Sequence, residues 1–342
     1  MPRTGGWGPS RRPAWHCDGV IASARLQAHS AHLRLAERRA VPFAGAAATY
    51  GGDFPDPYVE RFGEEYWAYG TQAGGMNLPV LRSDDLCAWE LMGDALPTMH
   101  RWAAPGRTWS PTILGCGDRY VMYHAVREPV SDRQCIAAAT AAVPDGPFVD
   151  AIGGPFVFQR ERGGSIDPSV FVDVDGRTYL LWKSDDNAIG GSPSLWGQEL
   201  SGDGLDLEGR PTELLRHDRA WERPLVEAPA MVRAGDLYYL FYSANWWESE
   251  RYCIGYAVGP SALGPFSKIT RRGPWMVSGP DAAGPGGQEF FHDSGGALWM
   301  AYHAWAPERA GYERGGRRSL RLSKIGFADG RPIVQPGGHP SP

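Results

Sequence analysis

The chain has 342 residues, of which 42% are hydrophobic and 21% are charged, as is usual for a soluble globular protein. Its net charge of −5, with lysines and arginines scattered along the sequence, excludes a basic surface of the kind that binds nucleic acid or an anionic membrane. No apolar segment approaches the roughly 20 residues that span a bilayer. The 14 tryptophans and 14 tyrosines favour a β-rich core, and some of these rings could stack on a sugar.

Residues 1–45 are rich in arginine and alanine and do not share the pattern that follows them. They lack the apolar stretch that a secretory signal needs after its positively charged start. We therefore expect an N-terminal extension over residues 1–45, either disordered or with a short helix near Leu26 to Arg39, and a cytoplasmic protein. The five cysteines have no CxxC or Cys/His spacing, so we expect mostly buried thiols and no zinc site.

From about residue 50 to residue 335, one pattern recurs five times. In each copy a proline- or glycine-containing turn leads into a short apolar strand, a Gly/Asp turn and an aromatic strand. The leading turns are Asp56-Pro57, Ser110-Pro111, Asp167-Pro168, Ala228-Pro229 and, more loosely, Gly284-Pro285-Gly286. Their prolines lie roughly 55–60 residues apart, the range in which a repeat of several strands forms a propeller blade.

Within each copy, apolar and polar residues alternate around the internal turn, which predicts a β-hairpin. Two further strand-like pieces follow, as in LPVLRSDDLCAWELMG and LWGQELSGDGLDLEG. Each copy therefore predicts about four antiparallel strands, and helical periodicity is nearly absent beyond residue 50. We predict an all-β fold, with a single five-bladed β-propeller over residues 46–342.

Carboxylates stand at or beside three of the five leading turns. Because the first strand of each propeller blade faces the central channel, the repeat should bring Asp56, Asp167 and Glu227 together. Trp109 and the turn at residues 284–287 should lie beside them. Carboxylates that share a partly enclosed pocket push one another's pKa values apart, which separates acid from base roles. The arrangement indicates an active site.

Four motifs stand in order along the first four repeats: GDFPDPYV, WSP, GGSIDPSVFVDVDGRTYLLWKSDDNA and VEAPAMVRAGDLYYLFYSAN. In this order and spacing, the chain resembles glycoside hydrolase family 43. The family consists of five-bladed propeller enzymes that act on arabinose- and xylose-containing polysaccharides. The resemblance covers residues 50–335.

By that resemblance, Asp56 corresponds to the general base, Glu227 to the general acid, and Asp167 to the aspartate that orients the acid and tunes its pKa. The resemblance also implies inversion of configuration. An inverting glycosidase needs one carboxylate to activate water and one protonated carboxyl to protonate the leaving oxygen, about 6.5–9.5 Å apart. An anion such as Asp167 would favour the protonated form of the donor.

Two motifs depart from the family pattern. Glu227-Ala228-Pro229 stands where the family often has Glu-Gly-Pro, which leaves the acid in place. Gly287 ends a Gly-Pro-Gly-Gly turn where the family more often has Gly-Pro-Gly-His, whose histidine commonly helps to hold a central metal ion. We therefore predict no metal and no other cofactor, although a central ion without that ligand stays an alternative. We expect His303 to be a hydrogen-bonded strand residue.

Five further residues are candidates for contacts with substrate: Trp109, Trp246, Lys183, Asn187 and Arg318. Each has a structural alternative. Trp109 could belong to the core. Lys183 and Asn187 could brace Asp167, and Arg318 could be a solvated strand residue. Of the two tryptophans in SANWWESE, we expect one to touch substrate. Asp53, three residues before Asp56, is predicted to be a turn residue.

We predict a hydrolase of α-L-arabinofuranosyl linkages in arabinan or arabino-oligosaccharides that acts from chain ends. GPGGQEFF and LWKSDDNA look most like the arabinofuranosidase and exo-arabinanase branch of the family. A β-xylosidase or arabinoxylan-active enzyme is the first alternative. The β-xylosidase alternative is disfavoured because β-xylosidases of the family often carry a C-terminal β-sandwich in addition to the propeller. The expected partner is an arabinose- or xylose-containing oligo- or polysaccharide, with neither nucleic acid nor membrane.

Three other functions fit the motifs less well. A retaining fructan-active propeller would need an Asn-Asp-Pro-Asn-like nucleophile element and a Glu-Cys acid motif, and neither occurs. A glycoside phosphorylase would need Arg, Lys and His at the funnel-facing turns. A carbohydrate-binding propeller without catalysis could lose any of the three carboxylates, whereas this chain keeps them all.

Overall fold

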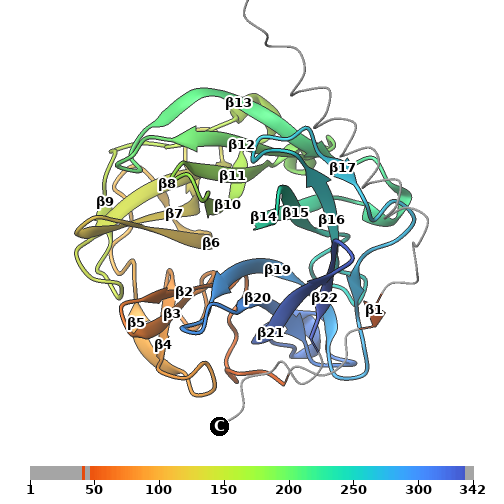
Figure 1. Ribbon diagram of the computed structural model, residues 1–342. Helices are drawn as coiled ribbons and strands as arrows, with labels where there is room; N and C mark the ends of the chain where they lie inside the picture. Colours follow the sequence, from red (N-terminus) through yellow and green to blue (C-terminus); the bar gives the residue numbers. More distant parts are fainter. Residues whose placement is uncertain (1–40, 43–46, 336–342) are drawn as a thin grey trace, which may run out of the picture.

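The computed structural model describes residues 41–42 and 47–335, and within these residues five small β-sheets stand in a ring (Figure 1). Four sheets have four strands each, and the sheet of the fourth blade has six. The first three strands of each sheet pair antiparallel in chain order, from an inner strand near the axis toward the rim. The predicted five-bladed β-propeller is confirmed.

The strands follow the predicted repeats blade by blade. Blade 1 contains β2 (Tyr58–Phe62), β3 (Glu65–Tyr69), β4 (Pro79–Ser83) and β5 (Glu90–Asp94). Blade 2 contains β6 (Ala104–Cys116), β7 (Arg119–Glu128), β8 (Arg133–Ala141) and β9 (Val149–Asp150). Blade 3 contains β10 (Ser165–Val172), β11 (Thr178–Ser184), β12 (Ser194–Leu200) and β13 (Leu207–Arg216).

The last two blades follow in the same way. Blade 4 contains β14 (Val226–Ala234), β15 (Leu237–Ala244), β16 (Cys253–Gly259), β17 (Ser267–Lys268), β18 (Met276–Val277) and the distant β1 (Val41–Pro42). Blade 5 contains β19 (Ala283–His292), β20 (Leu298–Trp305), β21 (Ser319–Ala328) and β22 (Arg331–Val334).

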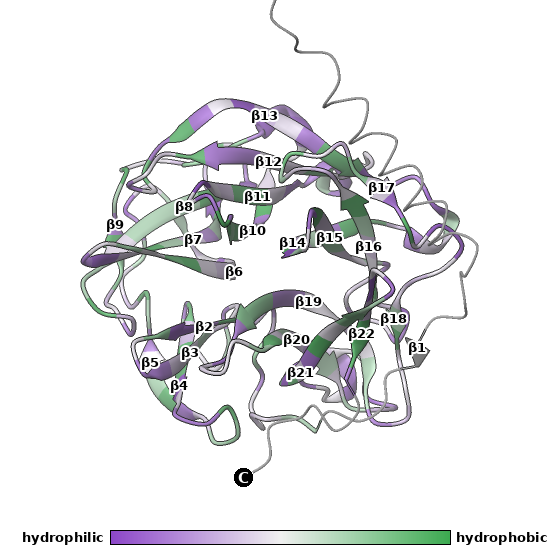
Figure 2. Ribbon diagram, in the orientation of Figure 1, coloured by the Kyte–Doolittle hydropathy of each residue, from purple (hydrophilic) through white to green (hydrophobic). Residues whose placement is uncertain are grey.

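The hydrophobic core lies between blades, because each sheet packs both faces against its neighbours. One cluster joins Tyr58 and Trp67 of blade 1 to Ile113 and Met122 of blade 2, and similar clusters fill the other four junctions. The middle strands are therefore apolar on both faces, as in β16, every residue of which is buried. Outer strands such as β13 are largely exposed and hydrophilic (Figure 2). This packing holds the inner strands in fixed relative positions.

The ring closes between blade 1 and blade 5 through the segment that precedes β2. The backbone N–H of Thr49 donates to the carbonyl of Leu320 at 3.0 Å, and that of Phe54 donates to the carbonyl of Arg318 at 2.8 Å. Nearby, β1 pairs in parallel with β18 and so extends blade 4. Residues 1–40 lie outside the described part of the chain, so the proposed extension and its possible helix stay predictions.

Helical structure in the described ranges consists of four 3-10 turns: η1 (Arg160–Arg162), η2 (Asp186–Ile189), η3 (Ala220–Glu222) and η4 (Tyr312–Arg314). Among the described residues, no helix has the length and apolar character to cross a membrane. Four cysteines are unpaired thiols, of which Cys135 and Cys253 are buried while Cys87 and Cys116 are partly exposed.

Candidate active site

The inner strands share a local distortion at one end of the ring. In four of them, two residues are skipped in the pairing register, and the four pairs are Ser110-Pro111, Asp167-Pro168, Ala228-Pro229 and Gly287-Gln288. The first residue of each pair is left-handed, with φ between 46° and 58°, and Asp56 before β2 has φ 49°. Such bulges turn a strand and re-aim its side chains. The repeat therefore directs one such position in each of the five blades toward the axis.

The register refines the sequence-based alignment in two places. In blade 5, β19 leaves the register at Gly284-Pro285, where the sequence places the fifth leading turn, and again at Gly287-Gln288. A Cβ on Gly287 would lie 2.9 Å from Oδ1 of Asp56, so the second bulge is the one that meets the turn of blade 1. Glu227 does not share the position of Asp56 and Asp167. It stands one residue earlier, opposite Ser243 of β15, where blade 2 has Trp109. Glu227 consequently approaches the axis from a different point on its strand.

A cavity of about 500 Å³ lies at this end of the ring. Its wall includes every site residue predicted from the sequence: Asp56, Trp109, Asp167, Lys183, Asn187, Glu227, Trp246 and Arg318. All five blades contribute to the wall, because residues from the segments around β2, β6, β10, β14 and β21 meet there. The repeat by itself predicts the meeting of Asp56, Trp109, Asp167 and Glu227.

Asp56 has the surroundings of an ionised carboxylate. Its Oδ2 accepts a hydrogen bond from the Thr71 hydroxyl at 2.6 Å, and the Arg318 guanidinium lies 3.6 Å from its Oδ1. Burial alone would raise the pKa of Asp56, but the Arg318 charge and the Thr71 hydrogen bond outweigh burial and hold this pKa below its usual value. Asp56 can therefore accept a proton near neutral pH.

Asp167 has weaker compensation. Its Oδ1 accepts from the Ser110 hydroxyl and its Oδ2 from the backbone N–H of Ala228, each at 3.0 Å. Burial and the neighbouring Glu227 raise the pKa of Asp167 to about 7, although Lys183 acts in the opposite direction. The carboxyl is thus fixed between blades 2 and 4 and titrates near neutral pH.

Glu227 is 8% exposed and has one donor at each oxygen. The ammonium of Lys183 lies 3.3 Å from its Oε2, and the Tyr252 hydroxyl donates to its Oε1 at 2.8 Å. Burial raises the pKa of Glu227, and Lys183 and Tyr252 offset this in part. Lys183 also donates to Asp185 at 3.2 Å, so this buried lysine braces Glu227.

Aromatic rings form much of the remaining wall. Trp246 is 46% exposed at the rim, and its ring centroid lies 6.0 Å from that of Trp247. The Arg318 guanidinium stacks over the Trp247 ring at 4.6 Å, so Arg318 is a buried cavity residue and not a solvated strand residue. On the opposite side, Asn187 in η2 has a buried Oδ1 with no hydrogen-bond partner among the described residues. The wall therefore combines apolar faces with a free hydrogen-bond acceptor.

Comparison with known proteins decides the family. The family model for glycosyl hydrolases family 43 matches residues 49–332, which is most of the chain. The chain belongs to this family. It is therefore a glycosidase, and the resemblance proposed from the sequence motifs is confirmed.

Several known proteins are similar to this chain over more than half of its length. The chain is 26% identical over 274 residues to the Beta-D-galactofuranosidase xynD of Aspergillus niger, covering 74% of each protein. It is 26% identical over 220 residues to the extracellular exo-alpha-(1->5)-L-arabinofuranosidase ArbA of Cellvibrio japonicus, covering 57% of this chain and 59% of that protein. The crystal structure of a thermostable family-43 glycoside hydrolase aligns with a TM-score of 0.74 and 28% identity, covering 85% of this chain and 95% of that one.

The residues around Gly287 do not fit the metal ligand that family 43 often has there. A Cβ on Gly287 would lie 2.7 Å from Nδ1 of His303 and 2.9 Å from Oδ1 of Asp56, so this space is already filled. His303 Nδ1 accepts a hydrogen bond from the backbone N–H of Asp56 at 3.0 Å. The neutral imidazole therefore carries its proton on Nε2, so neither ring nitrogen has a free lone pair for a metal ion. Among the described residues, no three His, Cys, Asp or Glu side chains form a metal site.

Several wall residues were not predicted from the sequence. Asp53 was assigned to a turn, yet it lines the cavity, and Tyr252 and Tyr312 line it as well. Tyr252 holds Glu227, and Tyr312 bonds to both Asp53 and Arg318. None of the three stands at a leading turn of the repeat. All three lie in segments between strands, and nothing in the sequences of these segments distinguishes them from residues at the rim that do not line the cavity.

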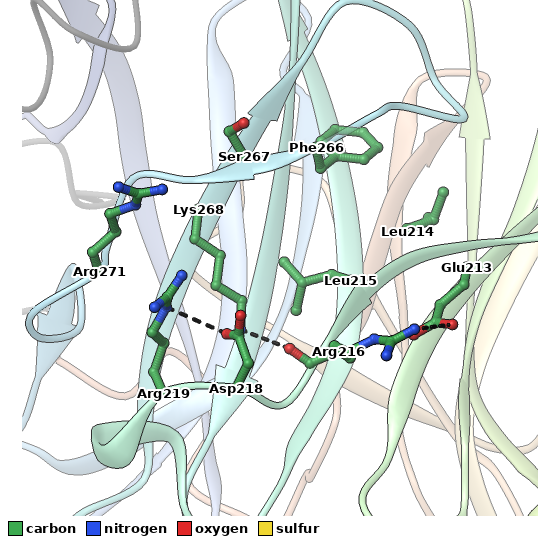
Figure 3. A pocket seen from close by; sticks show the side chains of 10 residues that line it. All are labelled: Glu213, Leu214, Leu215, Arg216, Asp218, Arg219, Phe266, Ser267, Lys268 and Arg271. Atoms are coloured by element: carbon green, nitrogen blue, oxygen red, sulfur yellow. Dashed lines mark hydrogen bonds and ion pairs between the residues drawn. The ribbon is translucent and has the colours of Figure 1, made fainter.

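A second depression, of about 350 Å³, lies on the outer rim between β13 and β17 (Figure 3). Its charged groups pair with one another: Arg216 with Glu213 at 2.8 Å and Arg219 with Asp218 at 3.3 Å. The Lys268 ammonium donates to the Arg216 carbonyl at 2.7 Å and to Asp218 at 2.6 Å. Because most of its charged groups pair with one another and none of the inner-strand carboxylates lines it, we assign the active site to the central cavity.

Proposed function

We propose that the chain is an inverting hydrolase that removes α-L-arabinofuranosyl residues from the ends of arabinan or arabino-oligosaccharides. In this proposal Asp56 is the general base, Glu227 the general acid and Asp167 the modulator of the acid. The observation that carries it is the meeting of three carboxyls in one cavity, where Asp56 faces the Arg318 guanidinium and the Thr71 hydroxyl while Glu227 is buried between Lys183 and Tyr252. These surroundings lower the pKa of Asp56, and burial raises that of Glu227. A base must be ionised and an acid protonated at the same pH.

The reaction is a single displacement. A water molecule held at Asp56 attacks the anomeric carbon and gives its proton to that carboxylate, while the bond to the leaving oxygen breaks. Glu227 gives its proton to that oxygen, so the leaving sugar departs as a neutral alcohol. The cycle ends with Asp56 protonated and Glu227 ionised, and proton exchange with solvent restores both. Lys183 and Tyr252 hold the Glu227 carboxyl throughout.

The wall of the cavity supports a sugar substrate. The exposed Trp246 ring offers a face for sugar C–H groups, and the Asn187 side chain in the same wall carries an amide that can bond a sugar hydroxyl. Trp109, partly exposed in the wall, offers a second platform. The names of two similar proteins refer to arabinofuranosidase and galactofuranosidase activity, which favours a five-membered sugar ring. The name Xylosidase/arabinosidase on a Butyrivibrio fibrisolvens relative keeps a xyloside as the second candidate.

The test is initial-rate hydrolysis of three p-nitrophenyl glycosides: the α-L-arabinofuranoside, the β-D-galactofuranoside and the β-D-xylopyranoside. The proposal predicts that the arabinofuranoside reacts fastest and that Asp56→Ala abolishes its turnover. A preference for either of the other two would overturn the substrate assignment and keep the catalytic residues. Full activity of Asp56→Ala would overturn the assignment of the base.

The chain-end preference has its own test, which is the time course of products from linear arabinan. Removal of terminal residues releases arabinose from the start while the polymer keeps nearly its full length. Early release of arabino-oligosaccharides together with a rapid fall in chain length would show internal cleavage and contradict this part of the proposal.

A further inference from the structure

Arg318 lies in a closed network that the proposed reaction does not by itself explain. Its guanidinium is stacked on Trp247 at 4.6 Å, lies 5.9 Å from the centre of the Trp305 ring, and reaches Asp56 at 3.6 Å. Its Nε donates to the Tyr312 hydroxyl at 3.2 Å. An arginine held by rings and hydrogen bonds has a defined orientation, whereas a free arginine at a cavity wall samples many.

Asp53 closes this network. One carboxylate oxygen accepts the backbone N–H of Arg318 at 2.8 Å, and the other accepts the Tyr312 hydroxyl at 2.9 Å. The Tyr312 hydroxyl thus donates to Asp53 and accepts from Arg318, so both of its hydrogen-bonding roles are used. Asp53 lies three residues before the proposed base. It fixes the main chain of Arg318 directly and the orientation of the Arg318 side chain through Tyr312.

The network is anchored outside the cavity by a link between blades 4 and 5. The backbone N–H of Tyr312 donates to the Glu248 carboxylate at 2.8 Å, and the indole N–H of Trp305 donates to the carbonyl of Trp247 at 3.1 Å. The Tyr312 ring packs against Trp305, with centroids 5.1 Å apart. The loop after β15 and the loop after β20 therefore hold the tyrosine in place from both sides.

We propose that Asp53 and Tyr312 are positioning residues that hold the Arg318 guanidinium against Asp56 and thereby set the acid limb of the enzyme's pH–activity profile. The inference rests on the proposed role of Asp56 as general base. Arg318 carries the only guanidinium or ammonium that the structure pairs with Asp56 among the described residues. A guanidinium free to move away would stabilise the ionised base less.

Other groups also face Asp56, and their contributions should stay constant when Tyr312 is changed. The titratable and charged groups around it are Arg318 and His303 of blade 5, Asp167 of blade 3, and Glu227 and Tyr252 of blade 4. Neither Asp53 nor Tyr312 is bonded to Asp56 itself among the described residues. Any effect of Tyr312 on the base must therefore pass through Arg318.

The test variant is Tyr312→Phe, which keeps the ring against Trp305 and removes the hydroxyl. The readout is the pH profile of kcat/KM on the nitrophenyl glycoside that the wild type hydrolyses. We expect the acid limb to move up by about half a pH unit or more, because the base becomes easier to protonate. Asp53→Asn should move it in the same direction. Tyr239→Phe is the matched control, since its hydroxyl donates to the Gly330 carbonyl outside the cavity.

A double-mutant cycle separates positioning from general loosening. Arg318→Lys should itself shift the acid limb, since lysine cannot reproduce the stacked, forked geometry. On that background Tyr312→Phe should add no further shift, because the two changes act through one group. Additive shifts, or a lower melting temperature with an unmoved limb in Tyr312→Phe, would overturn the inference.

A direct titration keeps the inference separable from the proposed function. The carboxyl of Asp56 can be followed by ¹³C NMR in protein labelled at aspartate, with the signal assigned by its absence from Asp56→Asn. A higher apparent pKa of Asp56 in Tyr312→Phe supports the positioning role, and an unchanged one overturns it. If Asp56→Ala stays active, the proposed base is wrong, and the titration still decides whether Tyr312 acts on Asp56.

Discussion

Each of the three carboxylates proposed for catalysis has a different set of donors around it. Asp56 faces a guanidinium and a hydroxyl, Asp167 a hydroxyl and a backbone N–H, and Glu227 an ammonium and a phenol. Burial raises the pKa of any carboxyl, so these donors decide how far each one departs from its usual value. At least one donor of each carboxylate comes from another blade, so the division of roles depends on how the blades pack together.

Glu227→Ala should slow substrates according to their leaving groups. Loss of a general acid costs about 10²–10⁴-fold where the leaving oxygen needs a proton, and much less where it leaves readily as an anion. We expect a large loss on arabino-oligosaccharides and a much smaller one on the 2,4-dinitrophenyl glycoside. Asp56→Ala is the control and should lose both activities alike, since water must be activated for either. Equal losses in Glu227→Ala would remove Glu227 from the role of acid.

Gly287→Ala should lower activity by displacing the base. The new Cβ would lie under 3 Å from both His303 and Asp56, and the residue has φ 58°, where alanine is strained. Gly63→Ala is a matched control, because its φ is 65° and nothing lies within 4 Å of its added Cβ. Both variants should lose about 1 kcal/mol of stability from strain. A fall in kcat confined to Gly287→Ala is predicted, and similar rates in the two would contradict it.

The repeated bulge is the element that builds the cavity. The sequence predicts it wherever a proline follows the left-handed residue, as in Asp56-Pro57 and Asp167-Pro168. It does not predict the fifth copy, because Gly287-Gln288 lacks a proline and Gly284-Pro285 precedes it by three residues. Both turns leave the register of β19 with β20, and both begin with a left-handed glycine. Only the proximity of Gly287 to Asp56 and His303 shows which of the two faces the axis.

Blade 4 depends on a buried ion pair between β17 and η3. The Lys268 ammonium donates to both oxygens of Glu222, at 2.6 and 2.8 Å, and Glu222 is fully buried and also accepts the Tyr242 hydroxyl. Glu222→Gln removes this buried carboxylate, while Lys268 keeps Asp218 at 2.6 Å and the Arg216 carbonyl at 2.7 Å. The variant should therefore lower the free energy of unfolding by about 1–3 kcal/mol, the usual cost of impairing buried, charge-assisted hydrogen bonds.

The control for this prediction is an exposed ion pair in blade 1. Glu64 is 95% exposed beside Arg61, so Glu64→Gln should change stability by less than about 1 kcal/mol. Both variants can be compared by denaturant unfolding at one pH. A loss in Glu222→Gln no larger than in Glu64→Gln would show that the buried pair does not stabilise blade 4.

At the scale of the whole molecule, the inner strands also hold two glutamates outside the active-site cavity, Glu60 and Glu289. Burial raises the pKa of Glu60 in β2 to about 7 and that of Glu289 in β19 to about 8. In the unfolded chain both ionise near pH 4, so between about pH 4 and 8 the folded state holds protons that the unfolded state has lost. Their contribution to stability is consequently greatest at low pH and is lost as the pH rises to 8.

Glu289→Gln, which mimics the protonated carboxyl, should therefore gain stability relative to wild type as the pH rises. We expect the difference in melting temperature between variant and wild type to be larger at pH 8 than at pH 5, by a few degrees. Glu64→Gln should show no such change, since Glu64 is exposed. An equal difference at both pH values would mean that Glu289 ionises normally in the folded protein.

The architecture and the principal site residues could be predicted because they follow from the repeat. A five-fold pattern fixes which residues meet at the axis, even when 60 residues separate them. The supporting residues could not be predicted, because their contacts are unrelated to the repeat: Tyr312 and Asp53 are 259 positions apart and meet only where blade 5 closes against blade 1. Asp53 therefore looks like a turn residue until the ring is closed.

The most direct test of the central claim is the stereochemistry of the first product. ¹H NMR spectra recorded in the first minutes of hydrolysis of an α-L-arabinofuranoside distinguish the two anomers before they equilibrate. A single displacement, with Asp56 activating water and Glu227 protonating the leaving oxygen, predicts that β-L-arabinofuranose appears first. Initial formation of the α-anomer would require a covalent intermediate and would contradict the assignment of Asp56 as a general base.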